Sequence, residues 1–525
     1  MMDITDEALS TRVSSSEGPS SLYQESLLEA DRQMNQYVAF EDGHKRGGLV
    51  DAPVTKHTPR LQSLDVSRGI TIALMIFVDN VGDSWPHVDH TPWNGIRLAD
   101  FVMPSFDVIV GMAIAFSMKQ GRLKSDKKWG MFVAALKRSI KLFLLGIWTQ
   151  AGTDFPTIAL KHFRIMGILQ RVSLCYATAA FAEIYIPERE APPASQTNQG
   201  IFSQYWRRHW RLVAQRGWHW AFMVALVGVW CALTYGVDPG CGRGHTHPDC
   251  NVASWLDQKI LGVNHMYFPH NGGVCEEKDV TFQRTHECSS CHPGKCLKPG
   301  APEWCGYESA CGGAPFDPEG LLSSVTCVVA SLFGAHVGRA VFAFEDNHFD
   351  RILHWVGLSL ASIGLGFALA LSGTCPLNTD LYSPSFLLVT NGASVLGFTA
   401  CYVACDVKGR NIDESFAAAP LRGLLECFRV MGMNSIAVYL LSCTGVAQAV
   451  LGAVFWDKRE ENLANLLWPT GVYWGPSDDN WLSNYSIAEV THQQNWVMVW
   501  CVCAYIPFWS LVAFVMHKNG LYLKV

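Results

Sequence analysis

Apolar stretches of about 17–25 residues recur from residue 61 to the C-terminal end, and they constrain the fold more than any other feature. Each is long enough to cross roughly 30 Å of bilayer hydrocarbon as a helix. Ten such stretches are found near 65–82, 97–118, 133–150, 164–186, 217–236, 319–341, 352–372, 382–405, 428–454 and 493–516. Charged residues make up 16% of the chain, against about 25% in soluble domains. The sequence therefore predicts an all-α, polytopic integral membrane protein with about ten transmembrane helices, in preference to a soluble protein with very apolar core helices.

The first 60 residues differ from the rest of the chain. They contain ten acids and six bases, many serines and no apolar run, which is typical of a disordered segment. They also lack the basic start and apolar core of a signal peptide. We expect residues 1–60 to form a disordered cytosolic tail and residues 61–525 to form one transmembrane domain. The net charge of −6 and the absence of a strong basic field argue against a nucleic-acid partner.

The bases in short loops predict the orientation of the spans. Residues 119–128 carry five bases in ten positions, whereas loop 81–96 carries none. Because basic loops stay on the cytosolic side, both termini and the 119–132 and 187–216 loops are expected in the cytosol. The lumenal or outer loops are then 81–96, 237–318 and 455–492.

The long loop 237–318, between the fifth and sixth spans, is rich in cysteine. It contains eight of the chain's 18 cysteines, namely Cys241, Cys250, Cys275, Cys288, Cys291, Cys296, Cys305 and Cys311. An even number on the oxidising side of a membrane predicts disulfides, with the connectivity left open. The motif from Cys288 to His292 also matches haem attachment, and its residue types suit zinc, but disulfides explain it more simply. A glycosylation sequon at Asn484 lies on the same predicted side.

Ionisable residues gather around the first lumenal turn. They are Asp79, Asp83, His87, Asp89, His90, Asp100 and Asp107, with Asn80 beside the first of them. A histidine flanked by carboxylates can take up a proton near neutral pH or act as a nucleophile in acyl transfer. Residue types alone leave open whether His87 or His90 does so. They also leave open a plain polar rim and a metal site built from His87, Asp89 and His90.

Seven short motifs occur in one order between about residues 61 and 445. They are Ser63-Leu-Asp65-Val-Ser-Arg68-Gly69, His90-Thr-Pro-Trp93-Asn94-Gly95, Leu98-Ala-Asp100-Phe-Val-Met-Pro104, Gly167-Ile-Leu-Gln170-Arg171, Pro315-Phe-Asp-Pro-Glu319-Gly, Asp406-Val-Lys-Gly409 and Gly432-Met-Asn434-Ser. In this order the chain resembles the heparan-α-glucosaminide N-acetyltransferase family. The cysteine-rich loop and the acidic tail look most like its plant members.

This resemblance implies a membrane-embedded acyltransferase. It would use acetyl-CoA as co-substrate from the cytosolic side and acetylate an amino sugar or related acceptor on the lumenal side. The family's active-site histidine falls on His90, and its usual asparagine partner falls on Asp79, with Asn80 next to it. Asp100 completes the expected catalytic set. Donors for the thioester oxyanion remain open among Asn80, Asn94 and Trp93.

Cations near the cytosolic side are candidates for binding the phosphates of CoA, for which arginine is well suited. Arg68 begins the first span, and Arg138 lies at the start of the third, beside Lys137 and Lys141. Arg171 lies seven residues inside the fourth span, roughly 10 Å deep. We therefore expect Arg68, Arg138 and Arg171 to bind the cofactor, with pairing of Arg171 to Glu183 or Asp100 as the alternative. No metal is expected.

Two other classes of function stay open. A transporter or channel would line its path with Asp79, Asp100, Asp107 and Arg171, although no inverted repeat is visible. An inactive scaffold of the same fold is the third interpretation. The expected partners are the lipid bilayer and a small-molecule or glycan acceptor, with a homodimer left open. The expected location is a vacuole-like or lysosome-like membrane or the plasma membrane.

Overall fold

The structure is a computed structural model of the full chain. It describes residues 61–82, 85, 87–91, 93–124, 128–150, 163–190, 201–247, 250–262, 265–267, 316–344, 347–407, 419–443, 499 and 501–523. Packing divides the chain into two units, 1–60 and 61–525. The expected tail, the six loop cysteines after Cys250, the Cys288 motif and Asn484 all lie outside the described residues.

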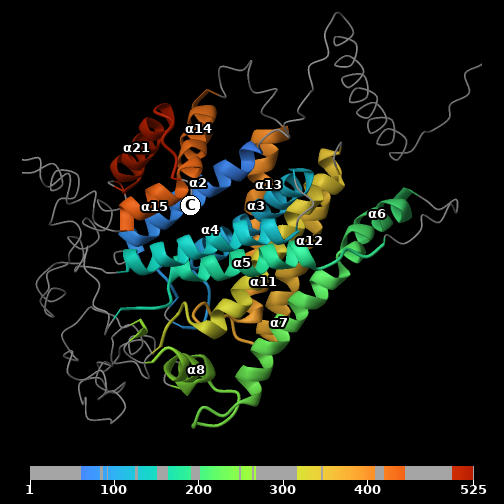
Figure 1. The fold of residues 1–525 in the computed structure, drawn as a ribbon, viewed down its shortest axis with the longest axis vertical. Helices are drawn as coiled ribbons and strands as arrows, with labels where there is room; N and C mark the ends of the chain where they lie inside the picture. Colours follow the sequence, from blue (N-terminus) through green and yellow to red (C-terminus); the bar gives the residue numbers. More distant parts are fainter. Residues whose placement is uncertain are drawn as a thin grey trace, which may run out of the picture. The chain divides into compact units, whose positions relative to one another are not determined.

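The described part of the second unit is almost entirely helical (Figure 1). Its longer helices are α2 (Gln62–Val81), α3 (Val102–Lys124), α4 (Lys128–Thr149), α5 (Ile168–Tyr185), α6 (Ile201–Gln215), α7 (Gly217–Gly236), α11 (Leu321–Ala343), α12 (His348–Leu371), α13 (Pro384–Tyr402), α14 (Ala419–Met433) and α21 (Ile506–Lys518). The shorter elements are η2 (Ala99–Phe101), β1 (Thr246–His247), β2 (Cys250–Asn251), α8 (Val252–Ile260), η8 (Val403–Val407), α15 (Ser435–Cys443) and η11 (Cys501–Tyr505).

The described parts of all ten expected stretches coincide mainly with helices, but they differ in how well they suit a membrane. Six described helices are long and apolar enough to cross one, or seven if α14 and α15, which meet at a bend of 80°, form one broken span. The other three stretches are α2, α4 and α5, which are less apolar over their length; α4, for example, carries Lys137, Arg138 and Lys141. Six to seven spans are therefore supported, and ten remains a prediction.

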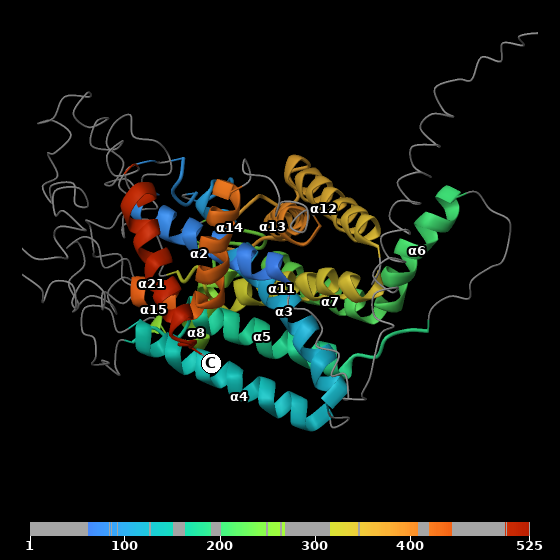
Figure 2. The same cartoon turned by 90° about the horizontal axis from the view of Figure 1, so that it is seen from above.

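The helices pack through close backbone contacts. Of the described helix pairs, α3 and α11 make the most extensive contact, followed by α12 with α13, which lie side by side in both views (Figures 1 and 2). A Cβ atom added at Gly111 would overlap the backbone of Ser331, and one at Gly334 would overlap the backbone of Val108. Small residues let helices in a bilayer approach this closely, so these glycines fix the spacing of the α3–α11 pair.

The start of α2 is held from a distant part of the chain. The Asp406 carboxylate accepts hydrogen bonds from the backbone N–H groups of Gln62 and Ser63, at 3.3 and 3.1 Å. An acid in this position satisfies free N–H groups and complements the positive end of the helix dipole. This contact gives the Asp406 motif a structural role in placing the first helix.

A small β-hairpin follows α7 on the predicted lumenal side. Strands β1 and β2 pair antiparallel, and a disulfide joins Cys241 to Cys250 beside them. The Trp93 indole donates a hydrogen bond to the carbonyl of Thr246 at 2.8 Å. One of the expected loop disulfides is thus present, and it lies in a hairpin that contacts the segment just after His90.

An ion-pair network joins α5, α7 and α11. The fully buried Glu183 carboxylate pairs with Arg216 and with Arg339, the latter at 2.7 Å. The expected pairing of Arg171 with Glu183 or Asp100 is therefore wrong, because Glu183 meets two arginines from neighbouring helices and Asp100 bonds the His90 segment.

We expect Glu183→Gln to lower the free energy of unfolding by about 3–5 kcal/mol, because two buried arginines would lose their shared carboxylate. Thermal unfolding of the full chain in detergent measures the change. Glu188→Gln is the matched control, because Glu188 lies 3.8 Å from the same arginines but its side chain is 47% exposed. Equal melting temperatures for the two variants would contradict this account.

Candidate active site

One cavity of about 430 Å³ opens among α2, α3, α4, α5 and the α14–α15 junction. Its wall along α2 runs from Arg68 through Ile72, Met75 and Val78 to Asp79. Eleven residues of helix separate Arg68 from Asp79, which is roughly 16 Å at 1.5 Å per residue. The cavity is therefore elongated along the first helix, with an arginine near one end and an acid near the other.

His90 lines the same cavity as Asp79, and its ring is hydrogen-bonded to Asp100. The Nδ1 atom of His90 lies 2.9 Å from Oδ1 of Asp100. Because a carboxylate only accepts hydrogen bonds, Nδ1 carries a proton, and in the neutral ring Nε2 keeps its lone pair. The His90 side chain is 58% exposed and that of Asp100 is fully buried, so the histidine is open to reactants while the acid is not.

Asp100 is anchored by the turn that carries it. Its Oδ2 accepts the Thr91 hydroxyl at 2.6 Å and the Arg97 backbone N–H at 2.8 Å. The Arg97 side chain in turn donates to the carbonyl of His90 at 3.0 Å. These bonds hold the histidine and its acid in one orientation, which is what a general base or nucleophile requires.

The surroundings of His90 favour its charged form. Burial lowers the pKa of the imidazole, but the hydrogen bond and charge of Asp100, with the charges of Asp380 and Asp89, outweigh it. The net effect is a pKa above the ordinary value for histidine. A higher pKa makes the neutral imidazole a stronger base, and it also raises the pH needed to deprotonate it.

The structure brings Asp79, but not Asn80, to the cavity. Asp79 lines the cavity and interacts electrostatically with His90. The Asn80 amide instead donates to the carbonyl of Ile76 in its own helix at 2.5 Å. Of the two candidate partners for His90, Asp79 is therefore the one that faces it.

None of the three suggested oxyanion donors lines the cavity. The indole of Trp93 is bonded to Thr246 and the amide of Asn80 to Ile76. Asn94 forms a β-bridge with Asn378, whose side-chain amide donates to it at 3.3 Å. These residues shape the loop around His90. His87 also lies outside the cavity lining.

Arg68 and Arg138 line the cavity, as the cofactor prediction required. Arg68 also pairs with Asp65 at 3.2 Å, one turn earlier in α2. The Arg138 guanidinium lies 5.0 Å from the centre of the Tyr176 ring. Both cations are thus positioned by neighbours and can meet an anionic ligand in the cavity.

Arg171 lies away from the cavity lining. It is buried, donates to the Ser323 hydroxyl at 2.7 Å, and lies over the Tyr382 ring. Asp107 is also absent from the lining, although it follows Asp100 by two helical turns in sequence. Asp100 belongs to the short helix η2, whereas Asp107 faces Cys327 in α11. The two acids therefore serve different sites.

Residues at the α14–α15 break complete the cavity wall. Asn434 and Ser435 line the cavity with Tyr439. Asn434 makes an interhelical contact, since its amide donates to the carbonyl of Ala513 at 3.3 Å. Its Oδ1, however, is buried without a partner in the described part of the chain. A polar pair interrupting an apolar span was the signal that could have identified this broken helix.

These features define a helical protein with six to seven candidate membrane spans among the described residues and a histidine–carboxylate pair at a cavity between its helices. Residues 60–189 match the family model "Heparan-alpha-glucosaminide N-acetyltransferase, catalytic". Over this region the chain is similar to the heparan-α-glucosaminide N-acetyltransferase family.

Two curated relatives extend the match beyond this region. The human heparan-alpha-glucosaminide N-acetyltransferase is 25% identical over 73% of this chain and 52% of its own length. The mouse protein of the same name is 24% identical over 89% of this chain and 60% of its own length. The chain thus spans between half and two thirds of the relatives it matches. The expected likeness to plant members remains a prediction.

Proposed function

We propose that this protein is a membrane-embedded acyltransferase that moves an acetyl group from CoA to an amine acceptor. The observation that carries the proposal is the cavity lined by both His90 with Asp79 and Arg68 with Arg138. In the predicted orientation the arginines lie toward the cytosol and His90 toward the lumen. One elongated space could then admit a thioester from one side and an amine from the other.

His90 supplies the reactive nitrogen in this proposal. Its Nε2 either attacks the thioester carbonyl, or removes a proton from the amine so that the amine attacks directly. In the first route a C–N bond to the imidazole forms as the C–S bond breaks, and the amine then takes the acetyl group. In both routes the proton from the amine ends on the CoA thiolate or in solvent. Asp100 stabilises the imidazolium that forms.

The middle of the cavity suits the extended arm of CoA. The Asn434 Oδ1 atom can accept a hydrogen bond only from an N–H or O–H donor, and the amide groups of the pantetheine arm are such donors. Arg68 and Arg138 would then meet the phosphates nearer the cytosol. The end of the cavity near His90, where the acceptor would bind, has acids close by, since Asp89 and Asp380 both interact electrostatically with His90. These acids favour the binding of a cationic amine such as an amino sugar.

We expect Arg138→Ala to raise KM for acetyl-CoA by roughly 10- to 150-fold and to leave kcat nearly unchanged, because a charge-assisted bond is worth roughly 1.5–3 kcal/mol. A change confined to KM indicates lost binding that substrate and transition state share. Lys137→Ala is the control, since Lys137 is exposed and absent from the cavity lining. Equal effects of the two variants would mean that surface charge, and not the cavity, binds the nucleotide.

The transport alternative fits the cavity less well. It required Asp79, Asp100, Asp107 and Arg171 to line one path, and of these only Asp79 lines the cavity. The other three are buried with hydrogen-bond partners. A solute path through another part of the chain is the form of transport that this arrangement leaves open.

The proposal is tested with the purified full chain in detergent, radiolabelled acetyl-CoA and a panel of hexosamines. We expect label in at least one amino sugar and none in the matching sugars that lack an amine. Consumption of acetyl-CoA without any acetylated acceptor, or no consumption with any sugar, would overturn the assignment for this class of acceptor.

A further inference from the structure

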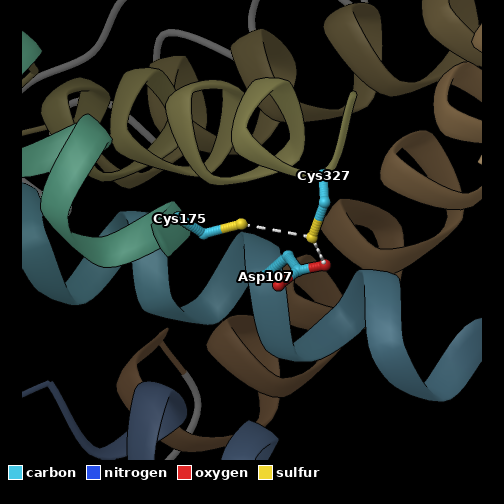
Figure 3. A group of neighbouring side chains, drawn as sticks. All are labelled: Asp107, Cys175 and Cys327. Atoms are coloured by element: carbon cyan, nitrogen blue, oxygen red, sulfur yellow. Dashed lines mark hydrogen bonds between the residues drawn. The ribbon is translucent and has the colours of Figure 1, made fainter. Parts of the chain in front are cut away.

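A second cluster of reactive side chains lies inside the helical bundle, apart from the cavity. Asp107 of α3, Cys175 of α5 and Cys327 of α11 point toward one another (Figure 3). Their ligand atoms all lie within 4.8 Å of one another, and all three residues are buried. Neither the acyl-transfer proposal nor the family resemblance assigns these residues a role.

The contacts within the cluster are somewhat shorter than the ligand spacing of a metal site. The sulfur atoms of Cys175 and Cys327 are 3.2 Å apart, and the Cys327 sulfur lies 2.8 Å from Oδ2 of Asp107. Tetrahedral zinc, with bonds of about 2.3 Å to sulfur and 2.0–2.2 Å to oxygen, sets its ligand atoms roughly 3.5–3.8 Å apart. Binding such an ion would widen the S–S separation by about 0.6 Å and the S–O separation by about 0.7 Å.

One oxygen atom of the Asp107 carboxylate lacks a partner in the described part of the chain, and the other is oriented by a neighbouring hydroxyl. Oδ1 of Asp107 is buried and has no hydrogen-bond partner among the described residues, which is costly for a carboxylate. Oδ2 accepts a hydrogen bond from the Tyr382 hydroxyl at 3.1 Å. Such a bond to a carboxylate is typical of the outer shell that orients a metal ligand.

The local charge also suits a divalent ion. Arg171 interacts electrostatically with Cys327 and Asp107, while Glu319, another acid near it, pairs with Arg164. On binding, both thiols lose their protons, so the ligands contribute three negative charges. A divalent cation and Arg171 contribute three positive charges, and the buried cluster stays neutral.

We propose that Asp107, Cys175 and Cys327 form a binding site for a thiophilic divalent cation, with zinc as the expected ion. Two thiolates and one carboxylate are ligands that zinc accepts, and the fourth position would go to water or a neighbouring oxygen. The site joins three helices, so its role is structural. It also stiffens the cavity, because Phe106 and Tyr176, the neighbours of Asp107 and Cys175, line the cavity wall.

Zinc content of the full chain tests this proposal. The protein is purified without a histidine tag, incubated with zinc, desalted and measured by elemental mass spectrometry, with about one ion per chain expected at this site. Cys175→Ser and Cys327→Ser should each remove that ion. Cys375→Ser is the matched control, because Cys375 is also buried but belongs to a different hydrophobic cluster, and it should retain the ion.

A second measurement covers the case in which a serine variant misfolds. Cobalt substituted into the wild-type protein should give a thiolate-to-metal charge-transfer band, and Asp107→Asn should alter this band in a protein that still melts cooperatively. Zinc bound equally by wild type, Cys175→Ser and Cys327→Ser would overturn the proposal. So would folded wild-type protein without zinc, or a Cys175–Cys327 disulfide in protein kept under reducing conditions.

Discussion

Replacing His90 with alanine is expected to lower kcat/KM for acetyl transfer by about 10³-fold or more, since both routes pass through its Nε2 atom. The loss should appear in kcat, while KM for acetyl-CoA stays within a few-fold, because Arg68 and Arg138 are untouched. The measurement is transfer of radiolabelled acetyl groups by the purified variant.

His87→Ala is the control for this result. His87 lies in the same loop, three residues earlier, but it is absent from the cavity lining. It should therefore transfer at nearly the wild-type rate. Loss of acetyl transfer in His87→Ala with normal transfer in His90→Ala would reverse the assignment. Normal transfer in both variants would show that neither histidine takes part in the reaction.

Asp100→Asn is expected to lower kcat by about 10²–10⁴-fold, because an asparagine can present its N–H to the ring and so favour the wrong tautomer. It should also move the pH dependence. The raised pKa of His90 means that the imidazole stays protonated to higher pH, so kcat/KM of the wild type rises as pH increases through that pKa. Removing the Asp100 charge lowers the pKa of His90. It therefore shifts the acid limb of the pH–rate profile, the range in which kcat/KM rises with pH, to lower pH.

The acid limb separates a chemical role of Asp100 from a structural one. A variant that merely loosens the loop would lose rate at every pH and keep the position of the limb. Asp89→Asn is a useful comparison, because Asp89 also raises the pKa of His90 but accepts a hydrogen bond from its backbone N–H and not from its ring. It should give a smaller shift with most of the rate retained. An unmoved limb in Asp100→Asn would contradict the pairing described here.

Much of this arrangement could be predicted from sequence because it depends on local patterns. Long apolar runs located the helices, and the ordered motifs pointed to His90 and its acids. Arg68 and Asp79 share one helix, so their separation along the cavity follows from helix geometry alone. The number of spans was less predictable, since α2, α4 and α5 carry charges that hydropathy counts against a membrane.

Contacts between distant parts of the chain could not be predicted. Arg171 was placed at the cofactor site because it lies deep in a span, but its partner Ser323 comes from a helix 152 residues away. The cluster of Asp107 and Cys327 joins residues 220 positions apart, and no spacing rule detects such a pair. That cluster also bears on the expectation of no metal, which the zinc measurement will test.

Sealed vesicles test the central claim most directly. The full chain is reconstituted into liposomes that enclose an amino sugar, and radiolabelled acetyl-CoA is supplied only outside. The account predicts labelled acceptor inside the vesicles, little in vesicles carrying His90→Ala, and no labelled CoA inside. Vesicles that accumulate no acetylated sugar, although the same protein is active in detergent, would contradict transfer through one cavity across the membrane.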